Sequence, residues 1–181
     1  FSGPGVTAAV PTIVSTAQST GANALFLTAS SDGALPLLGQ LLPQSGLGPS
    51  AIQYVGLTRW DIPSGTLSIP GIQGGWFALP DPTMAAQFRS RYAAAYGQEP
   101  HPVAGLAYDG IAAIGALVKS GRSNPFSTSA LTQGAGFAGV NGVFRLRPDG
   151  SNERGLAVAQ IQNGQVVVID PAPRSFSGAG L

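Results

Sequence analysis

The sequence has no cysteine and only one histidine. Without cysteine there is no disulfide, no thiol nucleophile and no cysteine-ligated metal. A Ser-His-Asp triad would need His101, but His101 lies between Pro100 and Pro102, and the sequence contains no G-x-S-x-G motif. The 8 acidic residues are scattered singly, which argues against a metal site. We therefore expect neither an enzyme nor a protein with a cofactor.

Charge is also scarce. Lys and Arg number 9 and Asp and Glu number 8, so the net charge is +1 and charged residues make up 9% of the chain. Because no basic field is available to hold a phosphate backbone, we expect no nucleic-acid partner. The longest apolar run, 103–118, contains Tyr108 and Asp109 and is too short to span a bilayer. It predicts a helix that is buried on most sides.

One glycine-rich motif, "GAGFAG" at Gly134–Gly139, matches G-x-G-x-x-G. A dinucleotide-binding loop of this type follows a strand and opens a helix. Here the motif leads into a predicted ribbon of strands, so we interpret the match as chance among 26 glycines. The chain also begins at Phe1 rather than at methionine, and we expect it to be processed or excerpted from a longer protein.

Strand-like and helix-like segments alternate along most of the chain. Short apolar runs predict three strands, at 24–30, 51–57 and 73–82, and the first is expected to be buried on both faces. Apolar residues at helical spacing predict helices, at 6–21 (begun or kinked at Pro11), 34–42, 83–96, 103–119 and 127–132. This alternation predicts an α/β fold with a doubly wound parallel sheet.

Capping residues mark the ends of several predicted helices. Ser31 or Asp32 can cap the helix at 34–42, and Asp81 can cap the next long helix, with Pro82 in its first position. Gly97 and Gly121 are the corresponding stop signals. The last segment, 139–170, alternates polar and apolar residues around Pro-Asp-Gly and Asn-Gly turns. It predicts a C-terminal antiparallel β-ribbon.

Polar residues follow the first two predicted strands, in "TASSDG" (28–33) and "GLTRWD" (56–61). In open α/β sheets, ligands lie outside the carboxyl ends of the strands. Hydroxyls, a helix start, one arginine and one tryptophan there can bind a small polar ligand. The candidate ligand-binding residues are Ser30, Ser31, Asp32, Thr58, Arg59 and Trp60. The alternative is structural: the serines and Asp32 only cap a helix, and Trp60 only packs.

The order of these elements resembles the type I periplasmic binding proteins, the Leu/Ile/Val-binding group of solute receptors. The resemblance is carried by "GANALFLTASSDGALPLLGQL", by "IQYVGLTRWD" and by "GGWFALPDPTMAAQFRSRYAAAYGQEPHPVAGLAYDGIAAIGAL". The closing "GVNGVFRLRPDGSNERGLAVAQIQNGQ" is similar to the family's last segment. The resemblance covers nearly all of this chain, but only the carboxyl-terminal half of a family member.

This resemblance implies a partial, two-lobed architecture. Residues 1–79 would belong to lobe two, 80–121 would cross a hinge and add helices to lobe one, and 122–181 would return with the ribbon to complete lobe two. Family members are non-catalytic, and they close two lobes on a ligand. The implied location is periplasmic or envelope-anchored, and the implied partners are a small polar ligand, such as an amino acid or carboxylate, and a membrane permease.

A narrower resemblance is carried by "GGWFALPDP", "FAGVNGVFRLRPDGSNERGLAV" and "IDPAPRSF". These segments look like penicillin-binding-protein activators, which are envelope lipoproteins on the same fold. A protein of this branch would act by contacting a peptidoglycan synthase rather than by delivering a solute to a transporter. It is the alternative function.

By position, the ligand contacts of the amino-acid receptors fall near Ser30–Ser31 and near Thr58. Those receptors have an aromatic residue at the first place and, at the second, a carboxylate that holds the ligand's ammonium. This chain departs from the pattern at both, although Asp32 or Asp61 can substitute, and Arg59 suits an anionic group. Because half of the fold is missing, we expect weak ligand binding and self-association through the apolar 103–118 helix.

Overall fold

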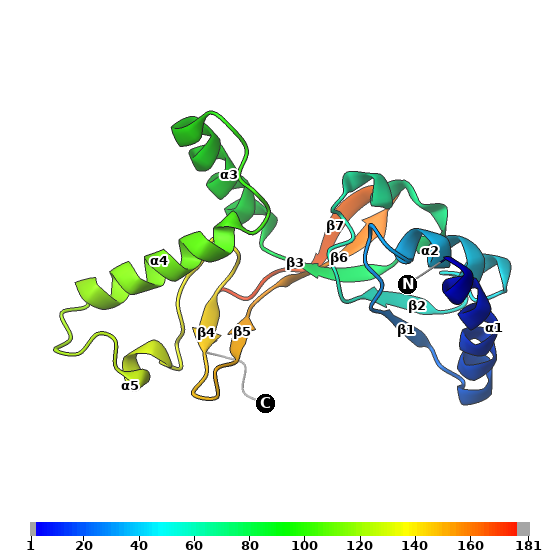
Figure 1. Cartoon of the computed structure of the whole chain (residues 1–181), viewed down its shortest axis with the longest axis horizontal. Helices are drawn as coiled ribbons and strands as arrows, with labels where there is room; N and C mark the ends of the chain where they lie inside the picture. Colours follow the sequence, from blue (N-terminus) through cyan, green and yellow to red (C-terminus); the bar gives the residue numbers. More distant parts are fainter. Residues whose placement is uncertain (1–2, 177–181) are drawn as a thin grey trace. The chain divides into compact units, whose positions relative to one another are not determined.

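The computed structural model describes residues 3–176, which form two compact units. Of these residues, unit 1 contains 3–79 and 158–170, and unit 2 contains 80–157 and 171–176. The chain therefore passes between the units three times (Figure 1). Within residues 3–176, no helix combines the length and the hydropathy needed to cross a membrane.

Unit 1 is built on a five-stranded sheet with the order β1-β2-β3-β6-β7 (Figure 1). β1, β2 and β3 run parallel, and β6 and β7 form an antiparallel hairpin that turns at Asn163 and Gly164, both with positive φ. The strand bounds are Ala24–Leu27, Gln53–Gly56, Trp76–Leu79, Ala157–Gln162 and Gln165–Asp170. The three predicted parallel strands and the Asn-Gly hairpin are confirmed.

Two helices pack together in unit 1, α1 (Gly3–Thr20) and α2 (Leu35–Gln44). Pro11 lies inside α1, and Gly21, with φ +63°, follows its end as predicted. The link between β2 and β3 contains two short 3-10 helices, η1 (Ser64–Ser68) and η2 (Pro70–Ile72), and η2 packs on α2.

One face of the sheet carries the core of unit 1. Side chains alternate between buried and less buried along β2, β3 and β6, as strand geometry requires. On β1, however, Phe26 is 58% exposed and only Leu27 is buried. The prediction of a first strand buried on both faces is therefore wrong, because α1 and α2 leave the Phe26 face open within the described residues.

Trp60 is the largest fully buried side chain, with 0% exposure. Its ring stacks on Phe77 at a centroid distance of 6.2 Å and lies against two glycines, Gly56 and Gly75. A Cβ added to either glycine would come within 2.4 Å of the indole ring. Trp60 thus packs where the backbone carries no side chain, and this fixes the segment that follows β2.

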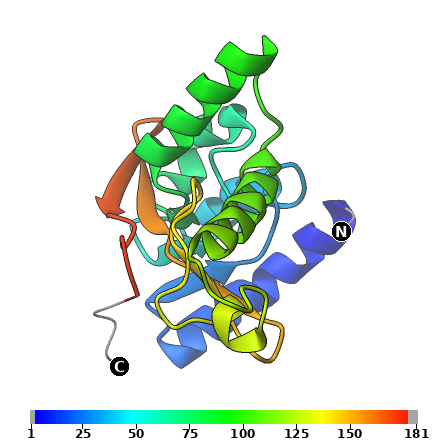
Figure 2. The same ribbon diagram turned by 90° about the vertical axis from the view of Figure 1, so that its left-hand side faces the viewer.

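Unit 2 contains three helices, α3 (Pro82–Tyr96), α4 (Ala104–Lys119) and the short α5 (Thr128–Leu131). Asp81 caps α3 through its Oδ1, which accepts hydrogen bonds from the backbone N–H groups of Thr83 and Met84, and Gly97 ends the helix in the left-handed conformation. These caps were predicted. The loop after α3 leads into α4 (Figure 2).

β4 (Phe144–Leu146) and β5 (Asn152–Arg154) form a separate two-stranded sheet, also in unit 2. The predicted ribbon is therefore two hairpins in different units, and residues 122–157 lie in unit 2 together with 80–121. The physical reason is that this segment has its own core. Leu117, Ala130, Phe137 and Phe144 pack together there.

The carboxylate of Asp109 is the polar centre of unit 2. Asp109 is 1% exposed, although it lies within the apolar run of α4. It accepts hydrogen bonds from Val140 N at 2.6 Å and from the Arg154 guanidinium at 2.7 Å. Gly139 permits this approach, because a Cβ there would lie 2.5 Å from Asp109 Oδ2. One buried charge thus joins α4, the 139–141 turn and β5.

We expect Gly56→Ala to destabilise unit 1 by about 1–3 kcal/mol, because the new methyl group displaces the Trp60 ring. Gly65→Ala is the matched control, since a Cβ at Gly65 meets nothing within 4 Å. Urea unfolding followed by tryptophan fluorescence measures both variants. Equal stability of the two variants would contradict the packing described here.

We expect Asp109→Asn to destabilise unit 2 by about 3 kcal/mol or more, because it leaves the Arg154 guanidinium partly buried without its counter-charge. Urea unfolding followed by circular dichroism measures the loss. Glu99→Gln, which alters an exposed carboxylate, should change the free energy of unfolding by less than about 0.5 kcal/mol. A loss equal to that of this control would show that Asp109 does not organise unit 2.

Candidate functional site

The two polar segments predicted to form a site lie side by side in unit 1. β1 and β2 are parallel neighbours, with Leu27 opposite Gly56, so both strands end at the same edge of the sheet. The ladder continues one residue further, because Leu57 N donates to Leu27 O at 3.0 Å. We call residues 28–33 and 57–61 the strand-end site.

Two hydrogen bonds tie these segments together. Ser31 Oγ donates to Arg59 O at 2.7 Å, and Thr58 Oγ1 donates to Ala29 O at 3.3 Å. Ser31 does not cap α2, and neither does Asp32, because the N-cap of α2 is Ala34 and no side chain caps that helix. The capping prediction for this helix is therefore wrong. The Ser31 hydroxyl bonds instead to the backbone of the neighbouring segment.

The only charge pair of the strand-end site is Arg59 with Asp61. Arg59 Nε donates to Asp61 Oδ1 at 2.6 Å, and its second guanidinium nitrogen, NH2, donates to Oδ2. The side chains are 36% and 16% exposed. A bidentate pair of this kind holds both groups in a fixed plane. The site therefore presents a positive and a negative group together.

Exposure separates the predicted residues. Thr28, Ser30 and Asp32 are exposed, and Thr58 is half-buried. Ser31 and Trp60 are buried, and the indole N–H of Trp60 has no hydrogen-bond partner among the described residues. Trp60 thus holds the position of its neighbours, and in this structure its ring offers no surface to a ligand.

A cavity of about 560 Å³ opens beside this site, still within unit 1. Its walls are the side of α1, strand β1 and the start of α2, and it includes Thr28 and Ser30 of the strand-end site. The apolar lining comes from Val6, Ala9, Ile13, Phe26 and Leu38. Sequence reasoning missed these residues. The one available signal was the apolar face of the first helix, which alone does not show which strand it meets.

Metal-binding groups do not gather in the described part of the chain, where no three His, Cys, Asp or Glu residues are placed to hold an ion. The strand-end site has hydroxyls, backbone groups and one ion pair. Such a set can bind a small polar molecule by hydrogen bonding. The hydroxyls of Ser31 and Thr58 both donate to backbone carbonyls.

Comparison with known proteins identifies the family. The sequence profile described as "Periplasmic binding protein" matches residues 4–165. Among solved structures, the chain is similar to a branched-chain amino acid ABC transporter periplasmic ligand-binding protein from Burkholderia xenovorans, with 19% identity and a TM-score of 0.62. That match covers 89% of this chain and 47% of the other. The search of curated proteins gave no match.

Two further structures share the fold. One is the leucine binding protein LivK from Thermotoga maritima, with 18% identity, a TM-score of 0.55, and coverage of 87% of this chain and 47% of the other. The second is the C-domain of LpoA from Haemophilus influenzae, a regulator of PBP1A, with 16% identity, a TM-score of 0.53, and coverage of 88% and 49%.

The chain thus spans about half the length of these structures. The predicted fold class, a partial type I periplasmic binding fold of α/β type, is confirmed. The family profile covers well over half of the residues. This chain belongs to the periplasmic binding protein family.

Proposed function

We propose that the chain is part of a non-catalytic solute receptor that binds a small polar ligand, such as an amino acid or carboxylate, at the strand-end site. The observation that supports this most is the pairing of the two segments through Ser31–Arg59 and Thr58–Ala29, which sets the Arg59–Asp61 ion pair at the carboxyl edge of parallel strands. Ligands of open α/β sheets lie at such edges.

The ion pair suits a ligand that carries both charges. Each guanidinium has five N–H donors, and Asp61 occupies two of those on Arg59. The remaining donors can bind a ligand carboxylate, and Asp61 can accept from a ligand ammonium. Asp61 would then replace the carboxylate that amino-acid receptors have at the position of Thr58.

The cavity beside Thr28 and Ser30 suits the rest of such a ligand. Its lining is mainly apolar, with the exposed hydroxyls of these two residues at its rim. An aliphatic or aromatic side chain would lose contact with water there. We therefore favour ligands with an apolar body and a charged head over sugars or inorganic ions.

A receptor function also implies where the protein works and which partner it has. The receptor would work in the periplasm or at the envelope surface, and it would deliver the ligand to a membrane permease.

Closure of two lobes on the ligand supplies much of a receptor's affinity, and this chain spans about half of its solved relatives. Binding by this chain alone should therefore be weak, with a Kd of about 1 mM, or −4 kcal/mol.

We expect calorimetric titration against leucine, isoleucine, glutamate and benzoate to show millimolar binding of at least one ligand. Arg59→Gln should weaken that binding at least about ten-fold, because a hydrogen bond to a charged group contributes about 1.5–3 kcal/mol. Arg89→Gln, which removes an exposed arginine of α3, should leave the affinity unchanged. Binding that is equally strong in the Arg59 and Arg89 variants would contradict the assigned site.

A second candidate function is contact with a peptidoglycan synthase. The observation that favours it is the mutual neutralisation of Arg59 and Asp61, which leaves the strand-end site without an unpaired positive charge for a ligand carboxylate. The fold similarity to the LpoA C-domain, a regulator of PBP1A, is compatible with it. If none of the ligands in the calorimetric panel binds and a purified peptidoglycan synthase binds directly, this function is favoured over the receptor function.

We also propose that the chain associates with itself through α4. Val103, at the start of this helix, and Leu106, Ile111, Ile114 and Val118 within it are each at least 46% exposed. Exposed apolar surfaces drive association.

Sedimentation velocity at high protein concentration should show dimers, and Ile111→Glu with Ile114→Glu should give monomers. Ala94→Glu, on an exposed position of α3, should still give dimers. A wild-type monomer under these conditions would contradict the proposal.

A further inference from the structure

The β4–β5 hairpin concentrates charge in a chain that otherwise has little. Five of the ten residues from 145 to 154 are charged, against 9% in the whole sequence. Strand alternation divides the hairpin's arginines between two environments. Arg154 pairs with the buried Asp109, whereas Arg145 and Arg147 are 32% and 45% exposed. Arg154 therefore stabilises the fold of unit 2. The exposed positions of Arg145 and Arg147 are not explained by that ion pair.

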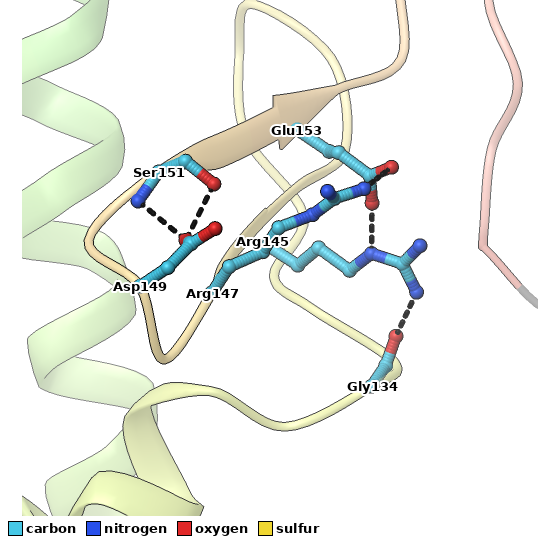
Figure 3. Close-up of polar contacts among 6 residues, drawn as sticks. All are labelled: Gly134, Arg145, Arg147, Asp149, Ser151 and Glu153. Atoms are coloured by element: carbon cyan, nitrogen blue, oxygen red, sulfur yellow. Dashed lines mark hydrogen bonds and ion pairs between the residues drawn. The ribbon is translucent and has the colours of Figure 1, made fainter.

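Arg145 and Arg147 converge on one carboxylate. Both guanidinium groups donate to Glu153, Arg145 to its Oε2 and Arg147 to its Oε1 (Figure 3). The hydrogen bond from Arg145, followed by that from Arg147, lowers the pKa of the Glu153 carboxyl. Glu153 is therefore ionised at neutral pH, and the three side chains together carry one net positive charge.

Most of the donors of this arginine pair have no hydrogen-bond partner among residues 3–176. The two guanidinium groups carry about ten N–H donors. In the described part of the chain, hydrogen bonds use three of them, two to Glu153 and one from Arg145 to Gly134 O at 3.3 Å. The free donors belong to a hairpin that is held in a single register, with Arg145 directly opposite Glu153.

Neighbouring groups fix the pair and add charge. The Arg145 guanidinium lies 4.6 Å from the centre of the Phe176 ring, a cation–π contact that restrains it. Arg122 donates to Gln133 Oε1 at 3.3 Å, next in sequence to the Gly134 that Arg145 contacts. Arg122 adds one positive charge and Asp149, on the same hairpin, adds one negative charge, so the local net charge is +1.

The one other charge on the hairpin is Asp149, whose carboxylate is occupied elsewhere. Its Oδ1 accepts from Ser151 N at 2.9 Å and from Ser151 Oγ at 2.6 Å, which closes the turn (Figure 3). These hydrogen bonds, that of the Ser151 hydroxyl first, lower the pKa of Asp149. Asp149 thus fixes the turn of the hairpin that presents Arg145 and Arg147.

We propose that Arg145 and Arg147 form an oxyanion-binding site for a phosphate group, either free or on a lipid headgroup. Arginine forks match the geometry of phosphate oxygens, and both a free phosphate, which carries about −1.5 to −2 at pH 7, and a lipid phosphodiester, which carries about −1, complement the local positive charge. Glu153 keeps the two arginines in place without neutralising them fully. This site is independent of the strand-end site and does not rest on the proposed receptor function.

The test uses the full 181-residue chain and inorganic phosphate as the probe, followed by the NMR signals of the arginine Nε–H groups. Phosphate should shift the Arg145 and Arg147 signals with saturation, and Arg145→Gln with Arg147→Gln should reduce the affinity at least ten-fold. Glu153→Gln, which removes the internal counter-charge, should strengthen binding several-fold. Arg89→Gln, on exposed α3, is the matched control and should bind like wild type.

A second arm distinguishes the source of the phosphate. Co-sedimentation compares vesicles of phosphatidylglycerol with vesicles of phosphatidylcholine, which carry no net charge. Retention on the anionic vesicles alone, lost in the double arginine variant, identifies a lipid headgroup, and saturation by inorganic phosphate without vesicle retention identifies a free phosphate. No response to either probe, or the same response in the double variant as in wild type, would overturn the proposal.

Discussion

The buried ring of Trp60 is the constraint on which the candidate site depends. It fills the space above Gly56 and Gly75, where no side chain competes for room, and it stacks on Phe77. Trp60 lies between Arg59 and Asp61, so its burial fixes where the ion pair stands at the edge of the sheet. The hydrogen bond from Ser31 to Arg59 O then attaches the neighbouring strand end to the same point. A residue first expected to touch a ligand thus acts by holding the residues beside it.

Unit 2 is organised in a comparable way by the carboxylate of Asp109. In unit 1 the bulky indole of Trp60 lies against glycines, and in unit 2 the buried carboxylate of Asp109 does so. In both units the missing side chain of the glycine allows the close approach. Around these centres several large apolar side chains remain exposed. The Phe26 face of β1 and one side of α4 are exposed, and the chain spans about half the length of its solved relatives. The proposed self-association rests on these exposed side chains.

Much of the fold was predictable because it is encoded locally. Strand–helix alternation, the Asp81 cap, the glycine stops and the Asn-Gly hairpin each depend on a few adjacent residues. The errors concern long-range packing. Sequence alone did not show that Ser31 would bond across to Arg59 rather than cap α2, that Trp60 would be buried, or that the β4–β5 hairpin would stay with α4 through the Asp109–Arg154 pair. The two hydrogen bonds join residues 28 and 45 positions apart, and Trp60 packs on Gly75 and Phe77, which are 15 and 17 residues further along the chain.

We propose that a small polar ligand binds where β1 and β2 end. The most direct measurement is an amide NMR titration of the whole chain with leucine and, separately, with benzoate. Ligand binding at this place should give saturable shifts that are concentrated at residues 28–33 and 57–61 and at the adjoining wall of α1. Saturable shifts confined to other parts of the chain, or no shifts with any ligand of the panel, would contradict it.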